Sequence, residues 1–407
     1  MQVSEVFTMG LGLQKPWFVT EVKFTPGENP LFGQVDIYID FERGSIFTGP
    51  AGETCTAYDS VPRTWQHLNF FQHKCLVHAH VPRIKTAAGG TEQVPAPWAR
   101  EGSGFTLMFE AMGMLLVENE MPVNKAAGMM GVRPGRIWRM LRHFVGKALK
   151  NENHSGVQRV GVDETSVKKG HKYVTVMACL AQRRVIGVAL GKGAESVAQI
   201  AKELKNRGFE PEKVTDVSID LSPAYISAAK AEFPCAEITF DKFHVVKLLG
   251  QAMDGLRRNE QREHSALKKT RYYWLKNDEN LKPEQIAARE QLALMFPRLG
   301  EGYRLKTVFR EFWAYKDKSG AEAFLESWCR AAEESGIPSF LDFVKTVKKH
   351  WAGILNYVES QVNNGILEGI NSKIQLARSR ARGYTNMDNF TAIIFLVAGK
   401  LNFDYPR

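Results

Sequence analysis

Three apolar runs of strand length follow one another between residues 159 and 190, and this succession constrains the fold more than any other feature. The runs read RVGVDET, KYVTVMACLA and RRVIGVAL. Beyond them the pattern alternates between helix and strand, through ESVAQIAKELKNRG, VTDVSID, SPAYISAAKAEFP and AEITFD. Three successive strands followed by this alternation predict an α/β fold, with a mixed sheet that helices cover on both faces.

The flanking segments predict further parts around this sheet. Residues 1–105 are rich in β-branched and aromatic residues between turn signals, which predicts a small β-rich module. Residues 106–150 hold helical patterns joined by a tight glycine-containing turn, the outline of a helix-turn-helix. The α/β domain is expected over residues 157–407, interrupted by a charged helical insertion at about 250–355.

The charge balance narrows the class of partner. The chain of 407 residues has 54 basic against 44 acidic side chains, a net charge of +10. This excess favours a polyanion, nucleic acid first and an anionic membrane surface second. Five scattered cysteines argue against a disulfide framework and for a reducing compartment. With neither a signal-peptide pattern nor a long apolar run, we expect a cytoplasmic protein that does not enter membranes.

Acidic residues stand where two core strand patterns end. Asp163 closes RVGVD and Asp220 closes VTDVSID, and carboxylates at such positions face the crevice where sheets of this type bind ligands. Mg²⁺ prefers oxygen ligands of this kind. Glu368, in a later helical stretch, is the natural third carboxylate. Taken one at a time, each aspartate could instead cap the following helix, and Glu368 could simply face solvent.

Four basic residues follow Glu368 closely, and they suit a polyanionic substrate. Three acids that serve two metal ions roughly 4 Å apart can activate an oxygen nucleophile and stabilise the leaving oxygen of a phosphodiester. Basic side chains beside them would hold the phosphate backbone without reading its sequence. These side chains are Lys373, Arg378, Arg380 and Arg382.

The helix-turn-helix carries its own basic stripe. In RPGRIWRMLRHF the arginines recur at helical spacing on one face, while Ile137, Leu141 and Val145 share another. A second helix with this pattern can enter a DNA major groove, although a solvated basic face on an ordinary helical hairpin would show the same spacing. The arginines are Arg133, Arg136, Arg139 and Arg142.

Three blocks of the sequence together resemble an insertion-sequence transposase of the ISL-three type. They are GVDETSVKKGHKYVTV, VSIDLSPAYISAAKAEFPCAEITFDKFHVVKLL and NNGILEGINSKIQLARSRARGYTNMDNF. The resemblance runs from about Arg63 to the C-terminal block, and it implies an RNase H-like core. It also implies that Asp163, Asp220 and Glu368 are the metal ligands of the acid triad.

The resemblance adds two residues whose role stays open. Asp241 and His244, in the DKFH that follows the last core strand, fall in the second block. They could position a metal ligand or contact DNA near the scissile phosphate. A buried, hydrogen-bonded pair with a purely structural role is an equal alternative.

The N-terminal module departs from the resemblance. Such transposases commonly carry a zinc ribbon with paired cysteines, but only Cys55 and Cys75 occur here, and a zinc site needs four ligands at short spacings. In a strand, His78 and His80 would share one face while Cys75 points to the other. We therefore do not expect zinc. The remaining histidines of the module are His67 and His73.

These features together predict a transposase that binds terminal inverted repeats, cuts DNA with two Mg²⁺ ions (Mn²⁺ being a substitute) and joins the ends to target DNA. Synapsis of two ends would require a homodimer or larger assembly. Two alternatives stay open: a metal-dependent RNase H-like nuclease or resolvase, and a DNA-binding regulator descended from a transposase. The regulator is disfavoured because all three acids are present.

Overall fold

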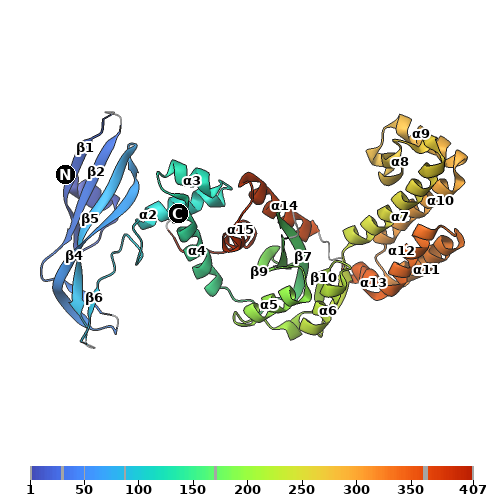
Figure 1. Cartoon of the computed structure of the whole chain (residues 1–407). Helices are drawn as coiled ribbons and strands as arrows, with labels where there is room; N and C mark the ends of the chain where they lie inside the picture. The colour runs from blue at the N-terminus through green and yellow to red at the C-terminus, as the bar shows by residue number, and fades with distance from the viewer. Residues whose placement is uncertain are drawn as a thin grey trace. The chain divides into compact units, whose positions relative to one another are not determined.

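The structure, a computed structural model, describes residues 2–28, 32–49, 51–86, 89–168, 172–360 and 365–405 (Figure 1). The chain divides into two compact units, Met1–Leu149 with Leu401–Arg407, and Lys150–Lys400. The sequence predicts that the α/β domain continues to residue 407, whereas the last residues belong to the first unit. None of the described helices offers the uninterrupted apolar length that a lipid bilayer requires.

A mixed sheet forms the body of the first unit. In the order β1-β2-β5-β4-β3, with β6 paired to β5, the described pairs are antiparallel except for β2 with β5. Trp17, Trp65 and Trp98 pack edge to face in its core, and α1 (Val3–Gly10) contacts β1. The strands are β1 (Trp17–Pro26), β2 (Gly33–Phe41), β3 (Ile46–Thr48), β4 (Thr54–Phe70), β5 (His73–Lys85) and β6 (Thr91–Gln93).

The predicted helix-turn-helix is present in the same unit. α2 (Leu107–Glu118) precedes α3 (Val123–Met129) and α4 (Pro134–Lys150). The turn between α3 and α4 passes through Gly131 at a φ of 64°, a conformation that glycine adopts without strain. Pro134 begins α4, where its missing N–H leaves no hydrogen bond unmade. As predicted, α4 buries one apolar face, which includes Ile137, Leu141 and Val145.

The end of the chain packs on α2 and α4. The Nζ of Lys147 lies 2.7 Å from a carboxylate oxygen of Asp404, and the hydroxyl of Tyr405 lies 2.6 Å from a carboxylate oxygen of Glu118. The ring of Phe144 meets the Tyr405 ring edge to face. These contacts tie residues 401–405 to the helix-turn-helix.

The second unit contains the predicted mixed sheet. β7 (Arg159–Lys168), β8 (Lys172–Cys179) and β9 (Arg184–Leu190) are antiparallel neighbours. β10 (Asp216–Ile219) and β11 (Glu237–Phe240) run parallel to β7, and the strand order is β11-β10-β7-β8-β9. The central strand, β7, is therefore the one that carries Asp163.

Helices cover both faces of this sheet, as predicted (Figure 1). A side chain at Gly187 would collide with Ile200 of α5 (Ala194–Lys205), and one at Gly161 would collide with Leu367 of α14 (Gly365–Arg380). The strand pairings place the two glycines on opposite faces. α6 (Pro223–Glu232) packs beside α5, and α15 (Met387–Ala398) packs beside α14.

A run of helices separates β11 from α14, and no strand occurs in the described part of this segment. Its core is aromatic and includes Trp274, Phe309, Trp328 and Phe340. The segment corresponds to the predicted helical insertion. Its α-helices are α7 (Lys242–Glu263), α8 (Arg271–Leu275), α9 (Pro283–Met295), α10 (Pro297–Phe309), α11 (Lys318–Glu334), α12 (Pro338–Lys349) and α13 (Trp351–Ser360).

Candidate active site

Three neighbouring parallel strands bring aspartates to one edge of the second sheet. Parallel pairing joins β10 to β7 as far as Ser218 and Gly161, and joins β10 to β11 as far as Ile219 and Phe240. Both registers continue to the same level just beyond the ends of β10 and β11. Because adjacent strands lie about 4.8 Å apart, side chains at this level are close neighbours. The residues that stand there are Asp163, Asp220 and Asp241. Asp220 and Asp241 directly follow their strands, but the prediction that Asp163 ends its strand is wrong: β7 continues to Lys168 because it stays paired with β8 beyond the level where β10 ends.

The electrostatics of Asp163 reflect this crowding. Burial raises the pKa of its carboxyl to about 6, and the negative charges of Asp220 and Asp241 act in the same direction. The N–H of Glu164, which donates to Asp163 Oδ1 at 2.8 Å, and the nearby His244 oppose the rise. Since a nearby positive charge would favour ionised Asp163, this edge is a place where a cation would be stabilised.

Asp241 and His244 form a hydrogen-bonded pair beside this edge. One oxygen of Asp241 accepts the N–H of Phe243 at 2.8 Å and caps α7. The other oxygen lies 2.8 Å from Nδ1 of His244, and this contact raises the pKa of the imidazole. The structural alternative for the pair accounts for these bonds, yet the pair also lies next to Asp220 and Asp163. The sequence signal was the position of Asp241 directly after a strand.

Asn371, to which the sequence analysis gave no role, touches Asp163 directly. Its Nδ2 donates to Oδ2 of Asp163 at 2.7 Å. One turn further along α14, Nε2 of Gln375 donates to the carbonyl of Ser166 at 3.1 Å, and Arg378 donates to the same carbonyl. With Leu367 seated over Gly161, these contacts align α14 along β7. The only sequence signal for Asn371 was its place one turn after Glu368.

Glu368 lies on α14 with its side chain exposed. Residues three apart share one flank of a helix, so Glu368 stands on the same flank as Asn371, one turn before it. The sequence predicts a cluster of Glu368 with Asp163 and Asp220. The structure brings the two aspartates together and places Glu368 one turn from the Asp163 contact. Among the described residues, no three His, Cys, Asp or Glu side chains are arranged to hold a metal ion.

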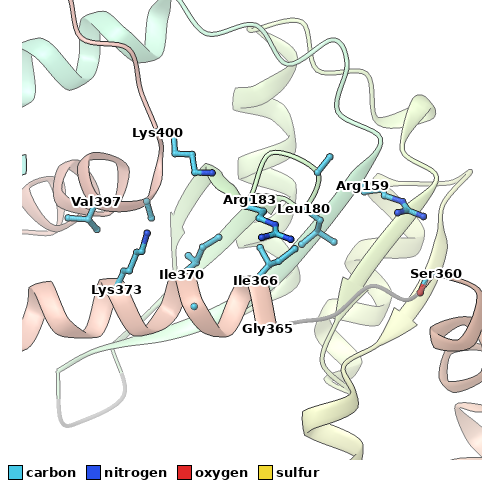
Figure 2. A pocket seen from close by; sticks show the side chains of 13 residues that line it. Arg159, Leu180, Arg183, Ser360, Gly365, Ile366, Ile370, Lys373, Val397 and Lys400 are labelled. Carbon is cyan, nitrogen blue, oxygen red and sulfur yellow. The ribbon is translucent and has the colours of Figure 1, made fainter. Parts of the chain in front are cut away.

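The four basic residues after Glu368 have different surroundings. Arg378 is half-buried and bonded to Ser166 and Gln375. Lys373 is exposed on the other flank of α14 and lines a cavity that Figure 2 shows. Arg380 is exposed near the end of α14, and the exposed Arg382 follows in a turn with a φ of 59°.

The arginines of the helix-turn-helix are all exposed, opposite the buried face of α4. The guanidinium of Arg136 stacks over the ring of Phe105 at 5.7 Å, which fixes the direction of its side chain. The surface is therefore a ridge of cations on a well-packed helix, a form that suits the phosphates and base edges of a groove. The arginines are Arg133, Arg136, Arg139 and Arg142.

The cysteines and histidines of the first sheet are separated or already partnered. Cys75 is buried on the face opposite His78 and His80, as the strand alternation predicts, and burial raises the pKa of its thiol to about 11. The Sγ of Cys55 lies 3.4 Å from the carbonyl of Lys85. The ring of His78 lies between Asp36 and Thr64. The other two histidines are His67, 2.8 Å from the hydroxyl of Thr106, and His73, whose ring meets the Phe24 ring edge to face.

Two family profiles and several known transposases match this chain. Residues 160–394 match the profile of a family described as transposase, and residues 94–145 match the helix-turn-helix domain of transposase family ISL3. The chain is 28% identical over 251 residues to the transposase for insertion sequence element IS1001 of Bordetella parapertussis, which covers 60% of this chain and 61% of that protein. It is 25% identical over 384 residues to the transposase for insertion sequence element IS1557 of Mycobacterium tuberculosis, covering 86% and 84%.

Proposed function

We propose, since this chain belongs to the ISL3 family of transposases, that it cuts DNA at the ends of an insertion sequence and joins those ends to target DNA. One observation carries the proposal: Asp163 and Asp220 stand level on adjacent parallel strands, and Asn371 holds Asp163 from α14. The matched family profile spans the sheet and α14, the elements that supply these residues.

We propose that the second unit has an RNase H-like core. Three antiparallel strands followed by two parallel ones, in the order β11-β10-β7-β8-β9, support this. So do the helices on both faces and the acids at the level where β10 and β11 end. The helical insertion between β11 and α14 is consistent with a core that is completed late in the chain.

The donor set at this edge fits a hard divalent cation. Carboxylate oxygens are the ligands that Mg²⁺ prefers, with water and phosphate filling its remaining positions. The pKa of Asp163 is raised, by burial first and by the charges of Asp220 and Asp241 in addition, so a bound cation would stabilise its ionised form. Asp163, Asp220 and Glu368 would hold Mg²⁺, or Mn²⁺ as a substitute. When bound, the ions supply activation of an attacking oxygen and stabilisation of a leaving oxygen at phosphorus.

The chain's own residues have separate tasks in this proposal. Asn371 keeps one oxygen of Asp163 oriented, and Arg378 fastens α14 to β7. Lys373, Arg380 and Arg382 neutralise phosphates of the bound strand.

The first unit supplies recognition of the DNA ends. The arginines of α4 and of the turn before it bind the terminal inverted repeats, and Arg136 contacts the ring of Phe105. Bringing two ends together requires at least two copies of the chain, and we place the reaction in the cytoplasm of a bacterial cell. The arginines concerned are Arg133, Arg136, Arg139 and Arg142.

The test is Mg²⁺-dependent cleavage and joining of DNA that carries the terminal repeats. Changing Asp163, Asp220 or Glu368 to alanine should lower the cleavage rate by at least about 10²-fold, because each removes a group at the reacting phosphate. Binding of the repeats by α4 should be unchanged. Glu212→Ala, which removes an exposed acid of the same unit, is the matched control.

Three results would contradict the proposal. Full cleavage by any of the three alanine variants would show that the acid it lacks is not part of the active site. Cleavage by the wild-type chain without any joining would identify a nuclease instead of a transposase. Binding of the repeats without either reaction would identify a DNA-binding regulator.

A further inference from the structure

A cavity of about 640 Å³ opens on the flank of α14 that faces away from Asn371. Its walls come from the start of β7, the turn between β8 and β9, the end of α13, the first turns of α14, and the end of α15 with the segment after it. In Figure 2 the side chains of Arg183, Lys373 and Lys400 lie on the same side of α14. Arg159 is the fourth cation of the lining, and none of the described lining residues carries a carboxylate.

Most of this positive charge is not neutralised. Arg159 donates from Nε to Asp216 at 3.1 Å. Lys400 donates to a neutral acceptor, the carbonyl of Gln182, at 2.9 Å. Within the described part of the chain, Arg183 and Lys373 form no ion pair. Cations gathered around one concave space repel each other, and a bound anion would offset that repulsion.

The backbone adds a second, independent observation. Arg183 has a φ of 53° and Lys400 a φ of 48°, the left-handed region that suits glycine and strains other residues. Both are long cations and both line this cavity. Strained conformations persist where the surrounding structure enforces them, and they gather at ligand sites. Glycine would fit both turns better, so the cations are not explained by the local conformation.

The rest of the lining limits the ligand. Leu180, Ile366, Ile370 and Val397 form an aliphatic wall, which suits the sugar of a nucleotide but offers no aromatic ring for base stacking. Arg159 stands four residues before Asp163 on β7, about 13 Å along the strand. The cavity and the acidic edge lie on opposite flanks of α14, so a DNA strand that reaches both has to cross this helix.

We propose that this cavity binds a backbone phosphate of single-stranded DNA without preference for the base. The proposal rests on the proposed function and assigns the site that holds the strand beside the reacting phosphate. A concave space of this size encloses one nucleotide of a free strand, whereas a duplex can reach only its rim. Lys373, expected from the sequence to contact DNA, acts here together with Arg183 and Lys400.

The test is fluorescence anisotropy of the full chain with a labelled single-stranded oligonucleotide of mixed sequence, in parallel with a duplex of the terminal repeat. The Arg183→Gly/Lys400→Gly double variant should bind the single strand about tenfold more weakly, and its salt slope should fall by about one to two. Its duplex affinity and melting temperature should not fall, since α4 is untouched and glycine accepts both backbone conformations. Lys202→Ala on α5, an exposed lysine of the same unit, is the control.

Lys373→Glu gives a second reading that changes no strained backbone, and it should weaken single-strand binding at least as much. Unchanged single-strand affinity in the double variant and in Lys373→Glu overturns the proposal. A mononucleotide that binds as tightly as the strand, and loses affinity in the same variants, overturns the assignment to DNA. Because cleavage is measured separately, intact cleavage with unchanged strand binding rejects only this cavity, whereas absent cleavage by the wild-type chain rejects the proposed function.

Discussion

In each of the two mixed sheets a side-chain amide donates a hydrogen bond to an aspartate, and the pKa values of the two aspartates are shifted in opposite directions. In the first sheet, Gln34 donates to both oxygens of Asp36 at 3.0 Å, and His78 contacts it at 2.7 Å. Burial favours the neutral form of Asp36, but these hydrogen bonds outweigh burial and its pKa is lowered. In the second sheet, Asn371 grips Asp163, and the pKa of Asp163 is raised to about 6.

The difference supports the proposal that the Asp163 cluster belongs to the active site and that the Asp36 cluster is structural. Asp36 is matched by a histidine and an amide, so the folded chain itself satisfies its charge. Burial is the largest influence on the pKa of Asp163, and the charges of Asp220 and Asp241 add to the effect of burial although His244 opposes it, so folding favours the neutral form of Asp163. Groups whose pKa values are shifted by burial and by like charges are typical of functional sites.

Removing the side-chain amides of Asn371 and Gln34 should produce the largest difference between the two sites. We expect Asn371→Ala to lower cleavage about 10–100-fold, the effect of removing a partner that orients a metal ligand. The Mg²⁺ concentration needed for half-maximal rate should rise, a change that a purely structural role would not produce. Asn371→Asp, equal in size but without a donor, should lose as much activity.

Gln34→Ala is the counterpart in the first sheet. It removes the equivalent amide from Asp36, so it should lower the melting temperature and leave the cleavage rate and its Mg²⁺ dependence unchanged. Cleavage by Asn371→Ala at the wild-type rate would contradict the role of Asn371 in orienting Asp163.

Neutralising the two aspartates should change stability in opposite directions. In metal-free protein at pH 7, Asp163→Asn should raise the free energy of unfolding by about 1–3 kcal/mol, because it removes a carboxylate whose pKa folding raises. Asp36→Asn should lower it by about 1–3 kcal/mol, since a charge-assisted hydrogen bond is lost. Chemical denaturation with EDTA present measures both.

The pH dependence of that difference follows from the sign of each shift. The raised pKa of Asp163 means that its unfavourable contribution is absent below about pH 4 and grows as the pH rises through about 6. The advantage of Asp163→Asn should therefore appear over this interval and stay constant above it. For Asp36 the pKa is lowered, so its stabilising contribution is present at neutral pH and is lost as the pH falls. An Asp163→Asn variant whose free energy of unfolding at pH 7 equals that of the wild-type chain would contradict the raised pKa of Asp163.

The fold of the second unit and part of the candidate site could be predicted from the sequence. Three strands followed by alternation determined the sheet, because period and length distinguish strands from helices. The position of Asp220 directly after β10 followed from it, whereas Asp163 lies within β7 and not at its end, because β7 continues beside β8. The burial of one face of α4 was likewise readable from apolar spacing.

Contacts between distant segments were not readable in this way. That Asn371 meets Asp163 depends on the direction in which α14 packs along β7, and no local pattern specifies that direction. Asp241 and Asp220 lie side by side because β11 pairs with β10 in a particular register. That register is formed only after the chain has passed through α6, so no local pattern specifies it. The cavity cations come from four separated segments, and only Lys373 stood out in the sequence.

Anomalous scattering from Mn²⁺ in crystals of the full chain locates the bound cation without reference to activity. It therefore tests whether the sheet edge with Asp163 and Asp220 is the active site. We expect a peak within about 2.2 Å of carboxylate oxygens of both Asp163 and Asp220, and none beside Asp36 and His78. Mn²⁺ that binds elsewhere at saturating concentration, with Asp163 and Asp220 untouched, would contradict the assignment of this sheet edge as the active site.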